Sequence, residues 1–146
     1  MRTFKVLRES GIHHGLVLKK GLNVDPVPFN PSGSGQPGGI HFASREVLAF
    51  LDLGLWLCEV ALPVGARVYR EPRGSAAWKA DRLILGEKRL LDLSIVGELV
   101  AEGANIRAWA DWPLRWAATK GLSDWVEFYI FRILEYVNPE WYHWSK

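Results

Sequence analysis

The sequence predicts an α+β fold: a small mixed or antiparallel sheet domain followed by a helical segment. The chain has 146 residues, 49% hydrophobic and 23% charged, which suits one domain with its own core. Strand-like segments precede Asp92 and helical patterns follow it. Strands first and helices last favour α+β over an alternating α/β arrangement. We therefore divide the chain into a strand-rich domain, residues 1–92, and a helical appendage packed on it, residues 93–146.

The strands are predicted from alternation and β-branched or aromatic content. Residues 3–7 alternate like a half-buried strand. Residues 55–62 form the clearest strand, with Trp56 and Val60 expected in the core. Two shorter strands are expected at residues 40–42 and 82–85.

The helices are predicted from apolar spacing and capping residues. A first helix is expected from Ser44 to about Leu53, before Gly54. A second should run from Leu93 to Glu102, capped by Asp92 and stopped at Gly103. Residues 116–137 should be mostly helical.

Residues 26–39 hold four prolines and four glycines and should form a long loop. Loops of this length in compact domains are usually functional or disordered. Either packing within the chain or a partner must hold it. Phe29 is the first candidate contact, with Asn23, Asp25 and Gln36 beside it. The alternative is that Phe29 simply plugs the loop onto the core.

Composition excludes several classes of protein. Cys58 is the only cysteine, so no intrachain disulfide can form. The first residues lack the apolar run of a signal peptide, and residues 47–63 are too short and too charged to cross a bilayer. We expect a soluble protein that does not bind membranes.

The charge balance argues against a dedicated nucleic-acid binder. Eighteen Lys and Arg face sixteen Asp and Glu, for a net charge of +2. Basic residues gather between Arg67 and Arg89. A solvated face is the simplest explanation, and an anionic ligand or acidic partner is the alternative.

Motifs that would carry chemistry are sparse. Four histidines occur, at positions 13, 14, 41 and 143, without the spacing of a zinc motif. A metal held by His13, His14 and His41 is conceivable because both segments are strands or strand ends, but we predict no metal. Neither a nucleophile-elbow motif outside the Pro/Gly loop nor a phosphate-binding loop is present.

Tryptophan is concentrated near the C-terminus. Six of the eight tryptophans lie between residues 109 and 144. Tryptophan is common among interface anchors. The candidate interaction residues here are Trp109, Trp112, Trp141 and Trp144.

The C-terminal part resembles one ankyrin repeat. The matching residues are Gly103-Ala104-Asn105-Ile106, Trp112-Pro113-Leu114-Arg115-Trp116-Ala117-Ala118-Thr119-Lys120-Gly121-Leu122 and Trp125-Val126. Trp112 and Arg115 replace the usual Thr and His, and no second repeat follows. The resemblance implies a single unit that must pack on the N-terminal domain or on another molecule.

The N-terminal part is similar to an uncharacterised domain that precedes ankyrin repeats in large DNA viruses and recurs in phage proteins. The matching segments are 21–25, 37–42, 59–63 and 78–81. This resemblance implies a viral protein made in the host cytoplasm. We predict a non-enzymatic protein acting through protein–protein contacts, with itself or with virion proteins, as a capsid or tail component.

A second pattern in the same residues looks like the motif order of ADP-ribosyltransferases. It consists of His14-Gly15, Gly21-Leu22, residues 39–43 and residues 57–62. The resemblance implies NAD as a cofactor. The prediction of a non-enzymatic protein requires no cofactor. The resemblance also implies that His14 holds the ribose, His41 replaces a stacking Tyr, and Asp81 or Glu87 supplies the acid.

Overall fold

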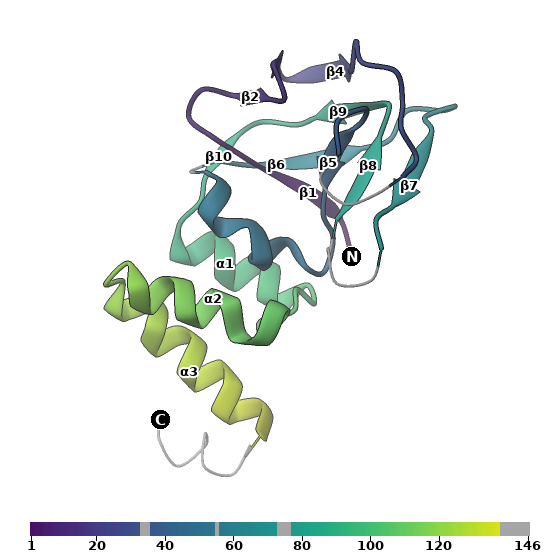
Figure 1. Cartoon of the computed structure of the whole chain (residues 1–146). Helices are drawn as coiled ribbons and strands as arrows, with labels where there is room; N and C mark the ends of the chain where they lie inside the picture. Colours follow the sequence, from purple (N-terminus) through teal and green to yellow (C-terminus); the bar gives the residue numbers. More distant parts are fainter. Residues whose placement is uncertain (33–35, 55, 73–76, 138–146) are drawn as a thin grey trace.

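The computed structural model describes residues 1–32, 36–54, 56–72 and 77–137 (Figure 1). Every strand pairing among them is antiparallel, so the α+β prediction with an antiparallel sheet is confirmed. The strands are β1 (Thr3–Leu7), β2 (Ile12–His13), β3 (Leu16–Val17), β4 (Gly21–Val24), β5 (Ile40–Phe42), β6 (Trp56–Ala61), β7 (Val68–Arg70), β8 (Trp78–Ala80), β9 (Arg82–Leu85) and β10 (Arg89–Leu90).

These strands form two sheets and a separate hairpin. The main sheet has the order β1-β6-β9-β4, with β10 also paired to β6. A three-stranded sheet has the order β5-β8-β7, and β2 pairs only with β3. A bridge between Phe4 and Ala43 joins β1 to the residue after β5. Strands β1, β5, β6 and β9 match the four predicted strands, whereas short strands such as β8 were not predicted from the sequence.

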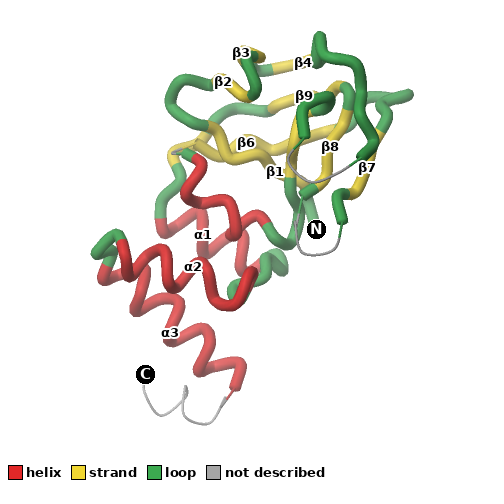
Figure 2. Tube along the Cα trace, in the orientation of Figure 1, coloured by secondary structure: helices red, strands yellow, loops and turns green. Residues whose placement is uncertain are grey.

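The main sheet separates two hydrophobic cores, which gives the molecule three layers. Figure 2 shows the helices on one side of the strands. Phe4, Val6 and Leu57 face the helices. Leu7 and Val60 belong to the second core, which includes residues of the three-stranded sheet. Because both faces of β1 are covered, four of its five residues are buried. The prediction of a half-buried strand is therefore wrong for residues 3–7.

In the described ranges, the helical layer contains one 3₁₀ segment and three helices: η1 (Val47–Leu53), α1 (Leu93–Ala101), α2 (Ala108–Thr119) and α3 (Ser123–Val137). The Asp92 carboxylate accepts a hydrogen bond from the Ile95 N–H at 2.9 Å, which confirms the predicted cap. The first predicted helix is shorter than expected and has 3₁₀ geometry. Ser44 does not cap it, because its hydroxyl donates to the Arg2 carbonyl.

Helix α2 begins with a turn of unusual hand. Trp109, Ala110 and Asp111 all have positive φ, between 52° and 62°, which costs L-residues roughly 1–2 kcal/mol each. The Arg115 guanidinium donates to the carbonyls of Trp109 and Ala110 and holds the turn. Right-handed helical geometry begins at Trp112, directly before Pro113. Proline is suited to the first turn of a helix.

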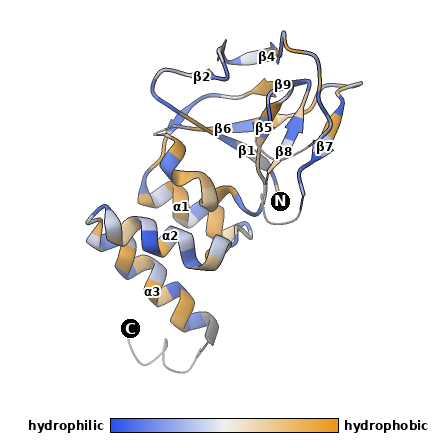
Figure 3. Ribbon diagram, viewed as in Figure 1, coloured by the Kyte–Doolittle hydropathy of each residue, from blue (hydrophilic) through white to orange (hydrophobic). Residues whose placement is uncertain are grey.

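The helices and the sheet share one core. Buried residues from β1, η1, α1, α2 and α3 form one cluster, and the contributors from the three helices include Val96, Ala117 and Tyr129. Apolar and polar residues alternate along α3 (Figure 3), and some apolar side chains such as Ile130 remain exposed. Among the described residues, no helix is long and apolar enough to cross a membrane.

The Pro/Gly segment is irregular in its described part, as predicted, and contacts within the chain hold it. The Asp25 carboxylate accepts hydrogen bonds from the N–H groups of Val27 and Gly39, both at 2.9 Å. The Lys79 ammonium donates to the Ser32 carbonyl. Gly39 has φ 141°, and a Cβ there would lie 3.0 Å from the Lys79 side chain. Glycine therefore lets this loop lie directly against Lys79.

Candidate functional site

A tight hairpin turn places two consecutive histidines on one side of the chain. Ile12 pairs with Val17 and His13 with Leu16, which leaves His14 and Gly15 as a two-residue loop. Both loop residues have positive φ, 48° and 80°, as a type I′ turn requires. In an extended strand neighbouring side chains point to opposite faces. Here the two imidazole centroids are 4.3 Å apart.

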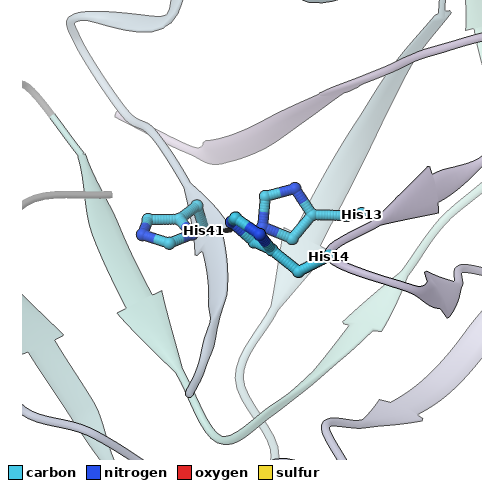
Figure 4. A group of neighbouring side chains, drawn as sticks. All are labelled: His13, His14 and His41. Carbon is cyan, nitrogen blue, oxygen red and sulfur yellow. Dashed lines mark hydrogen bonds between the residues drawn. The ribbon is translucent and has the colours of Figure 1, made fainter. Parts of the chain in front are cut away.

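The third histidine comes from β5. His41 lies opposite Lys79 of β8, and its ring centroid is 5.3 Å from His13 and 6.0 Å from His14. Figure 4 shows the three rings gathered together. Nitrogen atoms from the three rings all lie within 4.8 Å of one another. We call His13, His14 and His41 the histidine cluster.

A buried carboxylate and a buried lysine fix His41 from two sides. Glu71 follows β7, and one of its oxygens lies 2.5 Å from His41 Nε2. The Lys5 ammonium donates to the His41 carbonyl oxygen at 2.6 Å. Lys5, Glu71 and Lys79 are all buried. The cluster therefore has a charged, water-poor base, while His14 is exposed at its outer side.

Burial keeps the two inner imidazoles neutral. Desolvation, followed by the charge of Lys5, lowers the pKa of His13 to about 3. Desolvation also lowers the pKa of His41, although Glu71 acts in the opposite direction. Because a carboxylate only accepts hydrogen bonds, a neutral His41 holds its proton on Nε2. Its Nδ1 lone pair then faces His13 Nε2, 3.1 Å away.

The two predicted acids have other neighbours. Asp81 accepts a hydrogen bond from the Arg67 N–H and lies 3.7 Å from the Arg67 and Arg82 side chains. Glu87 is exposed and pairs with Lys20. Within the described part of the chain, the acid that contacts the histidine cluster is Glu71. The structure thus brings His14 and His41 together and adds an acid that the sequence did not single out.

The predicted interaction residues are spread over the surface. Phe29 is half-buried beneath the Arg67 guanidinium, 5.1 Å from the ring centre. Trp109 is 44% exposed and contacts Phe50 edge-on. Trp112 is half-buried, with Arg115 over its ring. Trp141 and Trp144 lie outside the described residues.

Sequence reasoning missed Glu71 and Lys5 as members of the site. Glu71 follows a three-residue strand and precedes Pro72, a pattern with no specific chemical meaning. The one sequence feature that could have indicated Lys5 is its place inside an apolar strand. A lysine there is buried only when both faces of the strand are covered. This covering depends on the packing of distant segments.

Comparison with known proteins shows that the chain is similar to proteins of one virus. It is similar to three proteins of Acanthamoeba polyphaga mimivirus, each named "Putative ankyrin repeat protein": R229, 37% identical over 119 residues; R868, 32% over 127; and R896, 29% over 132. These matches cover 76%, 83% and 87% of this chain, but only 39%, 62% and 40% of the relatives. No family model matches the chain, and no solved structure does. Its homologues are thus viral proteins, and it spans about two fifths to three fifths of their length.

Proposed function

We propose that this chain is a viral protein-interaction domain that contacts its partner through the helical layer. The observation that carries the proposal is the similarity to mimivirus proteins named for ankyrin repeats. Ankyrin-type units expose apolar surface until a neighbour covers it. The antiparallel pairing implied by the short α2–α3 connection suits such stacking. We also propose that residues 103–126 form an ankyrin-like unit.

Exposed apolar side chains on the helices support this contact surface. Trp109 at the start of α2 is 44% exposed, and Ile130 on α3 is 41% exposed. Large exposed side chains of this kind are favoured at interfaces. The partner under this proposal is a protein, either a virion protein or a second copy of the chain. In its most specific version, the proposal makes this chain a structural component of the virion.

The test is mass photometry or sedimentation of the purified chain, alone and mixed with virion proteins. A stable complex or self-association that Ile130→Ser weakens supports the proposal. Val24→Ser is the matched control, because Val24 is 55% exposed on β4 in the main sheet. A monomer that binds none of these proteins would refute it. Equal loss with both variants would also refute the assignment to the helical layer.

A second candidate is an NAD-binding, ADP-ribosyltransferase-like activity on a host protein. The observation that favours it is the proximity of His14 and His41, whose ring centroids are 6.0 Å apart. Under this reading Glu71 is a further candidate acid beside Asp81 and Glu87. Millimolar NAD should then raise the melting temperature, because ligand binding stabilises the folded state. His14→Ala should abolish transfer of labelled ADP-ribose. No shift and no transfer would end this alternative.

A further inference from the structure

We propose that His13, His14 and His41 form a binding site for a divalent transition metal of the zinc class. Two nitrogens on one tetrahedral zinc lie about 3.3 Å apart, given Zn–N bonds of about 2.0–2.1 Å. His13 Nε2 and His41 Nδ1 are 3.1 Å apart. One nitrogen from each of the three rings lies within 4.8 Å of the other two, and Figure 4 shows the His14 ring beside the other rings. Under this proposal the His14 ring turns toward the other two when the metal binds.

The hydrogen bonds of His41 match those of a metal ligand. Metal-bound histidines commonly donate their second ring N–H to a carboxylate, which fixes the tautomer and raises ligand basicity. Glu71 lies 2.5 Å from His41 Nε2 and is buried. His41 Nδ1 is thereby presented toward His13. On metal binding, His13 moves its proton from Nε2 to Nδ1, and its Nε2 lone pair replaces the hydrogen bond to His41 with a bond to the metal.

The donor set selects the class of metal. Imidazole nitrogens suit zinc, copper, iron and nickel, whereas magnesium and calcium require oxygen ligands. Three protein ligands leave one tetrahedral position for water. His14 is the exposed member of the cluster, so this fourth position faces the solvent side. Buried Lys5 and Lys79 oppose an added positive charge, and Glu71 offsets part of that opposition.

Substitutions at His14 can distinguish a loss of metal binding from a loss of folding. His14 has φ 48°, a conformation that Asn and Gly adopt readily. His14→Asn and His14→Gly therefore remove an imidazole without straining the hairpin. Ile12→Asn is the matched control, since Ile12 is exposed in the same hairpin but offers no ligand.

The experiment is calorimetric titration of the untagged, chelator-treated chain with Zn²⁺. We expect one Zn²⁺ per chain, a zinc-dependent rise in melting temperature, and no effect of Mg²⁺. Both His14 variants should weaken zinc binding about tenfold or more and still fold, whereas Ile12→Asn should bind as the native chain does. Glu71→Gln should weaken binding by about 10–100-fold. Absence of one-to-one binding, or unchanged affinity in both His14 variants, would overturn the proposal.

Discussion

Lys5 gives the sharpest test of how the two layers of sheet enclose the site. Its ammonium is buried between the main sheet and His41, and desolvation lowers its pKa from 10.5 to about 7. The unfolded chain therefore binds more protons than the folded chain between about pH 7 and about pH 10.5. Since stability rises with pH wherever the unfolded state binds more protons, the native chain should become more stable as the pH rises above 7.

The size of this effect follows from the two pKa values. The shift costs the folded state about 4 kcal/mol at pH 7 and about 2 kcal/mol at pH 9. The native chain should therefore gain about 2 kcal/mol over this range relative to Lys5→Met, which fills similar volume and carries no proton. Lys5 faces Cys58 across β1 and β6, and burial raises the pKa of that thiol. Burial therefore moves the titration of the Cys58 thiol upward, away from pH 7.

The assay is denaturant unfolding of both proteins at pH 7 and pH 9 in chelator-treated buffer, with equal denaturant slopes as a check on two-state behaviour. Lys5→Arg is a second variant whose charge does not titrate in this range. If the stability difference between the native chain and Lys5→Met is the same at both pH values, Lys5 keeps its proton in the folded state. That result would refute the reasoning.

Substitutions at three further positions test the packing and the helix cap. Tyr129 is fully buried and its hydroxyl has no hydrogen-bond partner within the described part of the chain, so Tyr129→Phe should be neutral or raise stability by about 1 kcal/mol; a loss in thermal unfolding would contradict this. Asp92→Ala removes the cap on the Ile95 N–H and should cost about 1 kcal/mol, whereas Asp92→Ser should retain most of the stability. A Cβ at Gly54 would lie 1.9 Å from the Leu7 carbonyl oxygen, so Gly54→Ala should cost about 3 kcal/mol; a melting temperature unchanged from the native chain would show that this approach relaxes freely.

Local sequence patterns predicted the positions of strands and helix caps better than they predicted which residues are buried. The strands at residues 3–7 and 82–85 and the Asp92 cap are confirmed, because alternation and capping act over a few residues. Val60 is buried as predicted, but Trp56 is only half-buried, with Lys88 over its ring. The burial of Lys5 could not be read from alternation, because it arises when a second sheet covers the other face of the main one.

The histidine cluster shows the same limit more strongly. His13 and His14 are separated from His41 by 28 and 27 residues, and Glu71 lies 30 residues further on. Their meeting depends on the order β5-β8-β7 and on where the β2–β3 hairpin lies. Neither is encoded in a short motif. The sequence offered the residue types and the positive-φ preference of a His-Gly turn, and tertiary packing supplied the geometry.

The layered architecture also separates the two proposals physically. The helices pack on one face of the main sheet, while the histidine cluster is built from the hairpin and the three-stranded sheet beyond the other core. Substitutions at distant sites with no shared contacts act independently. Ile130→Ser should therefore leave zinc binding unchanged, and His14→Asn should leave protein association unchanged. If either variant alters both readouts, the partner contacts the hairpin itself or metal binding rearranges the sheet, and the helical layer can no longer be treated as a self-contained interface.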